Sequence, residues 1–300
     1  MNSGALVGLL VMVVSEGLTL ARIEPFYSWN TPIAWSGFIL FADSVVFRAR
    51  KHSWLRSNPA EFVFLAVVSI PLWLVFEFYN LYIDNWYYTG LPANFWLRHF
   101  GYAWSFATIW PAIFEAADLI DVWRGSPRGL QLGQTHVDLA FNRRNLAGWV
   151  SVIFGVALLA WPLVWPSRYL AAPVWLGFIF LLEPINSRLG ADSLFEESRT
   201  AGYSQMTNLV LSGFLCGVLW EFWNYWAGAK WHYSVPIMEH LKIFEMPVPG
   251  YFGFPAFALE CFTMYVFVRA IATRLVPSMA PAFSYPIARP GPTPTLQARR

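Results

Sequence analysis

Residues 62–81, FVFLAVVSIPLWLVFEFYNL, form a predominantly apolar run in which Glu77 is the one charged side chain. A helix of about 20 such residues crosses the ~30 Å hydrocarbon core of a bilayer, so this run is predicted to span a membrane. A carboxyl group within a span costs at least ~2.5 kcal/mol on insertion scales and usually faces the interior of a helix bundle. Glu77 is therefore a candidate functional residue.

The whole chain has a membrane protein's composition. Hydrophobic residues make up 57% of its 300 residues and charged residues 13%, against roughly 45–50% and about 25% in soluble domains. The 20 basic and 18 acidic residues give a net charge of +2. We expect no nucleic-acid partner, because nucleic-acid binding requires a basic face. Cys216 and Cys261 lie in apolar segments and indicate neither a disulfide framework nor a thiolate metal site.

We predict an all-α, polytopic membrane helix bundle. Its eight predicted spans are residues 4–21, 32–48, 62–81, 101–120, 147–165, 172–187, 205–226 and 251–273. The sixth is short and contains Glu183-Pro184, so seven spans or a re-entrant sixth segment remain open. The first span is expected to be a retained helix, since no basic residue precedes it and no small-x-small cleavage site closes it.

The distribution of Lys and Arg predicts the orientation. With eight spans, 15 of the 20 basic residues fall on one side of the membrane, and cytoplasmic loops are enriched in basic residues. Both termini are therefore predicted to be cytoplasmic, in a multi-pass protein of a bacterial inner membrane. The five basic residues of the outer side are Arg22, Arg98, Arg168, Lys230 and Lys242.

The two halves of the chain resemble each other. Four matches occur in the same order: Trp35-Ser-Gly-Phe-Ile-Leu-Phe-Ala-Asp43 with Trp175-Leu-Gly-Phe-Ile-Phe-Leu-Leu-Glu183, Glu77-Phe-Tyr-Asn80 with Glu221-Phe-Trp-Asn224, Trp86-x-Tyr88 with Trp231-x-Tyr233, and Pro111-Ala-Ile-Phe-Glu115 with Pro255-Ala-Phe-Ala-Leu-Glu260. Each half holds four predicted spans, so both enter the membrane in the same sense. This pattern predicts a parallel 4+4 repeat around a shared cavity.

The predicted repeats cover residues 1–121 and 147–276, joined by a cytoplasmic linker, residues 122–146. The tail, residues 277–300, is rich in proline. We predict that it is disordered, because proline disfavours helix and the segment cannot supply a core.

The duplicated acids are the candidate catalytic residues: Glu77, Glu115, Glu221 and Glu260. The spans of Glu77 and Glu221 contain no basic residue to neutralise these two acids, so desolvation is expected to favour the protonated acid there. Asn80 and Asn224 follow Glu77 and Glu221 at i+3, where each amide is able to hydrogen-bond the carboxyl group or a shared ligand.

The candidate substrate-binding residues are Asn80, Asn224, Trp86, Tyr88, Trp231, Tyr233, Asp43 and Glu183. Structural roles remain open for all of them. Glu and Asn are able to hold helices together by hydrogen bonds, and Trp and Tyr are common at membrane interfaces. Arg48 and Arg188 lie close enough in sequence to form ion pairs with Asp43 and Glu183. No metal site is expected, since His99, His232 and His240 show no i, i+4 ligand spacing.

Buried acids and a 19% aromatic content fit protonation of an olefin. The acid supplies the proton, aromatic rings stabilise the carbocation, and exclusion of water prevents quenching. No phosphate-binding loop, paired-aspartate motif or Ser-His arrangement is present. The pattern favours an enzyme that cyclises or isomerises an isoprenoid or lipid from the membrane, and it indicates no particular cofactor or oligomeric state.

The second half also resembles a known family. Trp231-x-Tyr233, Gly250, Gly253, Pro255 and Glu260 before Phe262 are similar to the membrane lycopene cyclase domain and related integral-membrane terpene cyclases, and Trp86, Tyr88, Gly101, Pro111 and Glu115 match more loosely. The resemblance covers about 30–45 residues of each half. It implies a cyclase-like isomerase of carotenoid biosynthesis. That family typically has a Pro-x-Glu-Glu run and fewer spans per repeat, whereas this chain has single acids farther from proline.

A transporter is the main alternative, because parallel repeats, midplane acids and an axial cavity are also typical of proton- or cation-coupled carriers. Broken helices would favour it, and prolines at positions 71, 111, 184 and 255 are able to break spans. A non-catalytic membrane scaffold is the third possibility.

Overall fold

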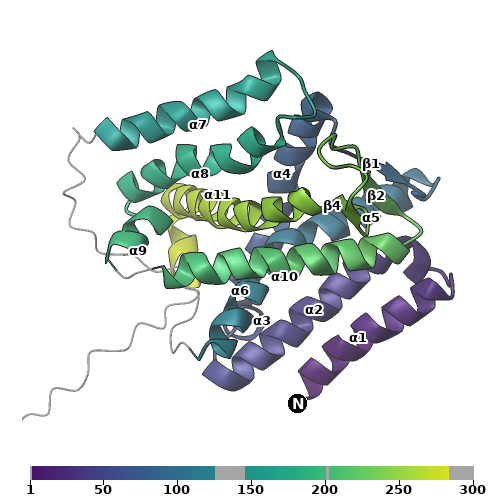
Figure 1. The fold of residues 1–300 in the computed structure, drawn as a ribbon. Coiled ribbons are helices and arrows are strands. Elements are labelled where there is room, and N and C mark those ends of the chain that lie inside the picture. Colours follow the sequence, from purple (N-terminus) through teal and green to yellow (C-terminus); the bar gives the residue numbers. More distant parts are fainter. Residues whose placement is uncertain (1, 126–145, 201–202, 284–300) are drawn as a thin grey trace, which may run out of the picture.

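The computed structural model describes residues 2–125, 146–200 and 203–283, and within them the predicted all-α class is confirmed (Figure 1). The first half contains α1 (Ser3–Leu20), α2 (Phe26–Arg50), α3 (Trp54–Ser57), α4 (Pro59–Ile83), β1 (Trp86–Thr89), α5 (Phe95–Ala107) and α6 (Ile109–Trp123). The second contains α7 (Leu146–Val164), α8 (Ala171–Arg188), α9 (Leu194–Thr200), α10 (Ser204–Trp226), β2 (Lys230–Tyr233), β3 (Lys242–Ile243), β4 (Met246–Pro247), η1 (Val248–Phe252), α11 (Gly253–Leu275) and η2 (Pro277–Ala282). Most of the predicted linker, residues 126–145, lies outside the described residues.

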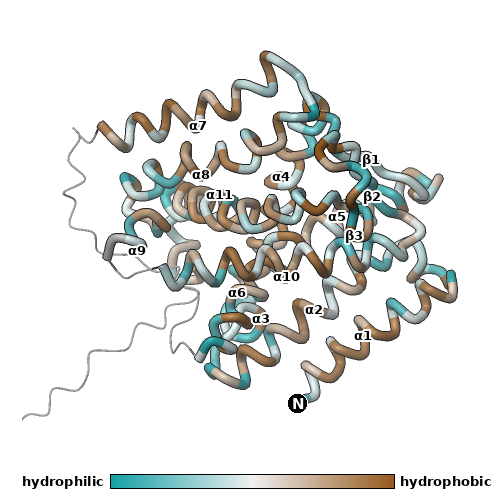
Figure 2. Tube along the Cα trace, viewed as in Figure 1, coloured by the Kyte–Doolittle hydropathy of each residue, from teal (hydrophilic) through white to brown (hydrophobic). Residues whose placement is uncertain are grey.

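Six of the described helical segments are long and apolar enough to cross a membrane: α1, α2, α4, α7, α10 and α11 with the preceding η1. This number fits a multi-pass membrane protein. The predicted eight spans are not all present as such helices. Apolar residues follow the helices in Figure 2, and polar residues gather at the ribbon formed by β1 and β2 and around α3 and α9.

The predicted span 101–120 is divided at Thr108 into α5 and α6. Pro111 lacks the N–H that would bond to the carbonyl of residue 107, which favours a break at this point. Ser69 of α4 occupies the break, where its hydroxyl donates to the carbonyl of Phe106 and accepts the N–H of Trp110 at 3.2 Å. The predicted sixth span is the continuous helix α8, which contains Glu183 and Pro184 and is not among the six.

Close glycine contacts hold the first two helices of each half together. A methyl group at Gly8 of α1 would lie 2.5 Å from the carbonyl oxygen of Gly37 in α2, and one at Gly155 of α7 would lie 2.9 Å from the carbonyl oxygen of Gly177 in α8. No side chain fits at either place. Both pairs therefore depend on small residues, as is common where membrane helices approach closely.

A short antiparallel ribbon joins the two halves. Strand β1 follows α4, and β2 follows α10. Trp86 lies opposite Tyr233, and Tyr88 lies opposite Trp231. The two matching Trp-x-Tyr sequences thus pair with each other, and the two strands lie together at one end of the bundle (Figure 1).

The start of the predicted disordered tail is ordered. Pro277–Ala282 forms the short helix η2, and Phe283 is buried against Phe64 with ring centroids 4.6 Å apart. The 3-10 helix tolerates proline in its first turn, and the aromatic contact gives the segment the apolar anchor that its composition did not indicate. The remainder, residues 284–300, lies outside the described residues.

Candidate functional site

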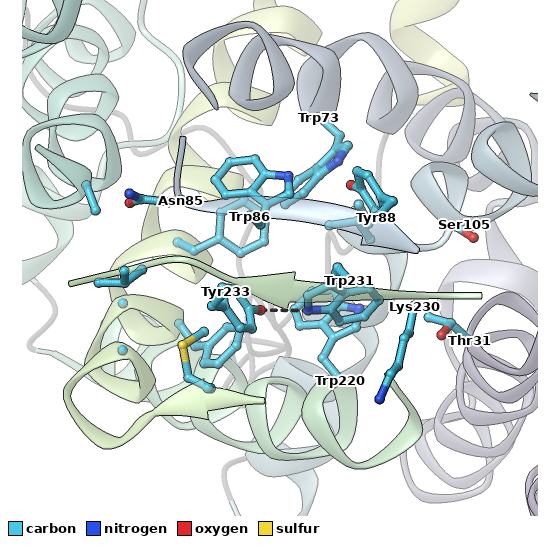
Figure 3. Close-up of a pocket in the computed structure, with 18 of the residues that line it drawn as sticks. Thr31, Trp73, Asn85, Trp86, Tyr88, Ser105, Trp220, Lys230, Trp231 and Tyr233 are labelled. Atoms are coloured by element: carbon cyan, nitrogen blue, oxygen red, sulfur yellow. Dashed lines mark hydrogen bonds between the residues drawn. The ribbon is translucent and has the colours of Figure 1, made fainter. Parts of the chain in front are cut away.

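A cavity of about 470 Å³ lies beside the β1–β2 ribbon (Figure 3). Segments from both halves enclose it, including the start of α2, α5, the start of α8, and the start of α11. Its aromatic lining includes six tryptophans, namely Trp29, Trp73, Trp86, Trp175, Trp220 and Trp231. No Asp or Glu of the described residues lines it. The cavity therefore offers apolar and aromatic surface to a ligand.

The two asparagines position the ribbon rather than a ligand. The Asn80 amide donates to the carbonyl oxygen of Trp86 at 2.8 Å, and its oxygen accepts the N–H groups of Asn85 and Trp86 at 2.8 and 3.2 Å. The Asn224 amide donates to the carbonyl oxygen of Trp231 at 2.8 Å and accepts its N–H at 2.9 Å. The i+3 spacing does not bring either amide to its carboxyl group, because the backbone of the following strand occupies the amide.

Glu77 receives three hydrogen bonds on one oxygen. The Trp73 and Trp86 indole N–H groups donate to Oε1 at 2.8 and 3.2 Å, and the Tyr88 hydroxyl donates to it at 2.5 Å. All three donors line the cavity, whereas Glu77 does not. Three donors on one oxygen leave that oxygen an acceptor. Glu77 thus acts as a hydrogen-bond acceptor that orients three aromatic side chains of the cavity wall.

Glu221 has a sparser environment. The Tyr233 hydroxyl donates to Oε1 at 2.8 Å and accepts the Trp231 indole N–H at 2.8 Å, a bond drawn in Figure 3. Glu221 is fully buried, and its Oε2 accepts no hydrogen bond from the described residues. A buried oxygen without a donor fits a protonated carboxylic acid better than a carboxylate.

Tyr88 and Tyr233 are the links between these acids and the cavity, because both tyrosines line it. Burial raises the pKa of each hydroxyl well above 10, and the adjacent Glu raises it further. Both groups therefore remain neutral hydroxyls near neutral pH and are able to donate and accept a proton at once.

Glu115 and Glu260, the other two predicted catalytic residues, lie inside the bundle away from the cavity lining. Neither carboxyl oxygen of Glu115 has a hydrogen-bond partner among the described residues. Glu260 accepts the backbone N–H of Phe178 at 3.1 Å on Oε1, and its Oε2 has no such partner. Both acids are buried, but the structure does not bring them to the cavity.

Asp43 and Glu183 bind backbone that folds back after their helices. Asp43 accepts the N–H of Leu55 at 2.9 Å, and Glu183 accepts the N–H of Phe195 at 3.2 Å. The Ser193 and Thr263 hydroxyls also donate to Glu183, each at 2.8 Å. Neither acid lines the cavity, and backbone and hydroxyl groups of the fold are the hydrogen-bond partners of these two predicted substrate-binding residues.

Arg48 and Arg188, the ion-pair partners considered for Asp43 and Glu183, lie elsewhere. Arg56 lies 3.6 Å from Asp43, whereas Arg48 is exposed. The Arg188 guanidinium lies over the Trp149 ring, 4.2 Å from its centroid. The short helix α3 returns Arg56 to the end of α2, which spacing along one helix does not indicate.

Sequence reasoning missed several lining residues, among them Trp29, Trp175, Trp220 and Arg98. Trp175 belonged to the matching stretch Trp175–Glu183, but its counterpart Trp35 is fully buried in the core, 4.8 Å from the rings of Trp220 and Trp223. The repeat signal alone therefore does not separate a cavity tryptophan from a core one.

The described residues contain no group of three or more His, Cys, Asp or Glu that is able to hold a metal ion. His232 instead bonds Glu245 at 3.0 Å, and Lys230 bonds it at 2.9 Å. Burial raises the pKa of Glu245, but the bonds from Lys230 and His232 outweigh it, so the pKa is lowered overall.

The chain was also compared with known proteins. No protein-family model matches it, and neither does a curated protein or a solved structure.

Proposed function

We propose that the protein is an integral-membrane enzyme that binds an isoprenoid or similar apolar lipid in this cavity and protonates one of its double bonds. The observation that carries the proposal is the Tyr233–Glu221 pair. A hydroxyl in the wall of an aromatic cavity is hydrogen-bonded to a fully buried carboxyl group that has one oxygen without a donor.

The pair is able to deliver a proton in two coupled transfers. The Tyr233 hydroxyl turns its proton from Glu221 Oε1 to an alkene carbon, and a C–H bond forms from the π electrons. Protonated Glu221, whose proton then faces the tyrosine oxygen, returns a proton to Tyr233. The neighbouring alkene carbon becomes a carbocation. Loss of a proton from another carbon to the same pair then yields an isomer or a ring, so the reaction consumes no oxidant, reductant or co-reactant.

The walls suit a cationic intermediate. Ring centroids of Trp86 and Trp175 are 6.3 Å apart, those of Trp175 and Phe257 are 5.4 Å apart, and those of Trp220 and Phe257 are 6.1 Å apart. Aromatic faces attract cations within about 6 Å by ~0.5–2 kcal/mol each. An apolar lining also keeps out the water that would quench a carbocation.

The parallel 4+4 repeat belongs to this proposal. In both halves an acid accepts a backbone N–H twelve residues later, at Asp43 and Leu55 and at Glu183 and Phe195. Asn80 and Asn224 hold the next strand in the same way. With α8 as a full crossing and α5 and α6 sharing one, eight crossings would leave both termini on the same side. The enrichment of that side in Lys and Arg supports the cytoplasm of a bacterial inner membrane. The resemblance to the lycopene cyclase domain supports an isoprenoid substrate.

The carrier alternative draws support from the break between α5 and α6. In transporters, broken helices direct unpaired backbone groups at the substrate. Here Ser69 accepts the N–H of Trp110 and donates to the carbonyl of Phe106, so the broken ends serve the fold. The enzyme is the better-supported function.

Lipid extracts test the proposal. Membranes that contain the protein should accumulate an isoprenoid isomer, equal in mass to its precursor, that is absent without the protein. Tyr233→Phe should abolish that product while the folded protein remains in the membrane. Identical lipid profiles with and without the protein, over carotenoid and polyprenyl precursors supplied in turn, would contradict the enzyme.

A further inference from the structure

We propose that the lipid bound in the cavity carries a phosphate head group, which is held by Arg98 together with the Trp29 indole N–H and the Thr31 hydroxyl. The inference rests on the proposed function, since it assumes that the cavity takes an isoprenoid chain.

The charges of the lining residues point to an anion. The charged residues that line the cavity are Arg98, Arg168 and Lys230, and all three are basic. Arg168 is bonded through Nε to Asp84 at 2.9 Å, and Lys230 to Glu245 at 2.9 Å. Arg98, which is half-buried, makes no hydrogen bond or ion pair with any residue of the described ranges. A positive charge is thus left uncompensated in the cavity wall.

Two neutral donors without partners line the same cavity. The Trp29 Nε1 and Thr31 Oγ1 atoms are buried and have no hydrogen-bond partner among the described residues. The Thr31 residue is 8% exposed. A buried donor without an acceptor costs on the order of 1–3 kcal/mol, so two of them in one cavity wall indicate an acceptor supplied by a ligand.

Helix α5 brings Arg98 to the side where Trp29 lies. Gly101 follows Arg98 by three residues and therefore shares its helix face. A methyl group at Gly101 would lie 3.1 Å from the Trp29 Nε1 atom. The missing side chain at position 101 lets α5 pack closely against the indole N–H, next to the face that carries the guanidinium.

The donor set matches a phosphate better than an alcohol or a hydrocarbon end. Arg offers a planar fork of N–H donors that fits phosphate oxygens, and bonds of this kind are about twice as strong as neutral ones. Hydroxyl and indole donors complete the coordination of oxygens that accept several bonds. The tryptophans of the remaining lining then hold the chain, which places the head group and the reacting double bond at different parts of the cavity.

The test uses the purified full-length protein in neutral phosphatidylcholine nanodiscs, with quenching of tryptophan fluorescence as the readout. Geranylgeranyl phosphate, geranylgeraniol and inorganic phosphate are titrated in turn. We expect the lipid phosphate to bind about thirty-fold or more tightly than the alcohol, the order expected for a partly buried charge pair. Arg98→Gln should remove this preference without weakening binding of the alcohol.

Lys242→Gln is the matched control, because it removes one positive charge from an exposed site outside the cavity lining. It should keep the full preference. Thr31→Val keeps the side-chain shape. It should weaken binding of the lipid phosphate several-fold and leave binding of the alcohol unchanged. If Arg98→Gln does not fold, Arg98→Lys and Thr31→Val carry the test, and Arg98→Lys should retain part of the preference.

Equal binding of the phosphate and the alcohol would overturn the head-group inference and leave the proposed function standing. A full preference that survives Arg98→Gln, or binding of the lipid phosphate that Thr31→Val leaves unchanged, would do the same, since it would assign the phosphate to another site. Inorganic phosphate that binds as tightly as the lipid phosphate would show a site for the free anion. Failure of both lipids to bind would remove the proposed function itself, and this inference with it.

Discussion

Glu77 and Glu221 occupy matching positions in the two halves but have different surroundings. Each precedes an Asn that holds the next strand, and each accepts a hydrogen bond from a cavity tyrosine. Glu77 also accepts two indole N–H groups, whereas Glu221 has a buried oxygen without a donor. A repeated motif therefore predicts where an acid lies without predicting whether it holds a proton.

Two differences in hydrogen bonding separate the acids, one outside the matching stretches and one within them. Trp73 lies one turn before Glu77 and donates to it, while Gly217 stands at the corresponding place before Glu221. The Trp231 indole N–H bonds the Tyr233 hydroxyl, whereas the Trp86 indole N–H bonds Glu77 itself. With these differences, Glu221 in the second half is the acid that fits a proton donor.

The largest expected effect is on activity. Glu221→Gln keeps size and hydrogen bonding but removes the transferable proton, so product formed per folded molecule should fall by ~10²–10⁴-fold, the usual contribution of a general acid. The activity of Glu77→Gln should fall much less, because Glu77 only orients the aromatic side chains of the cavity wall. The measurement is the rate of product formation by the purified variants, normalised to folded protein.

Glu115→Gln and Glu260→Gln are the controls, since both acids are buried away from the cavity lining. Their activity should follow their abundance. Near-normal activity in all four Gln variants would mean that the carboxyl groups hold helices together and that the enzyme assignment is wrong.

Stability should show the reverse order. Glu77→Gln weakens three hydrogen bonds to one carboxyl oxygen, each worth ~0.5–1.5 kcal/mol net, so the free energy of unfolding should fall by about 2–3 kcal/mol. Glu221→Gln should cost on the order of 1 kcal/mol, because an amide replaces a carboxylic acid that already offers one donor and one acceptor. Thermal unfolding in the same detergent compares them. A larger loss of unfolding free energy for Glu221→Gln would mean that Glu221, and not Glu77, is the acid that stabilises the fold.

Much of the fold could be predicted because the length and apolar content of a sequence segment indicate a membrane helix. The runs that became α1, α2, α4, α7, α10 and α11 each carry that signal within their own residues. The divided span at Thr108 does not, because its break depends on Ser69 from another helix. Local composition predicts a helix, and a distant partner decides where it ends.

The site was predictable only in part for the same reason. The Trp-x-Tyr matches identified Trp86, Tyr88, Trp231 and Tyr233, all of which line the cavity. Their pairing across the halves joins residues far apart in the chain, which no local periodicity indicates. The acids Asp43 and Glu183 carry the same repeat signal yet bind backbone at Leu55 and Phe195, so duplication marks structural and cavity residues alike.

A smaller difference is expected between the two asparagines. Asn80 accepts two backbone N–H groups and donates once, whereas Asn224 accepts one and donates once. Each bond contributes ~0.5–1.5 kcal/mol net, and a buried group left without a partner costs more. Asn80→Ala should thus lower the unfolding free energy by about 1 kcal/mol more than Asn224→Ala, measured by thermal unfolding. Equal losses would mean that the extra Asn85 bond contributes nothing.

At high pH the two halves should behave alike. Burial raises the pKa of both Tyr88 and Tyr233 well above 10. Above pH ~10 the unfolded chain loses these hydroxyl protons and the folded protein keeps them, so the unfolded state binds fewer protons. Stability is then lost as pH rises, by up to ~1.4 kcal/mol per pH unit for each tyrosine. Below pH 10 neither tyrosine adds a slope.

Tyr88→Phe and Tyr233→Phe should each make the fall in unfolding temperature between pH 9.5 and 11 shallower than in the unchanged protein, and by similar amounts. The lysines titrate in the same range but are common to all three proteins, so the differences isolate the tyrosines. A shallower fall in one variant alone would show that one of the two hydroxyls is reached by water, and the halves would then differ at the tyrosines as well as at the acids behind them. Three parallel curves would contradict the burial of both hydroxyls, on which the proposed proton transfer from Glu221 through Tyr233 depends.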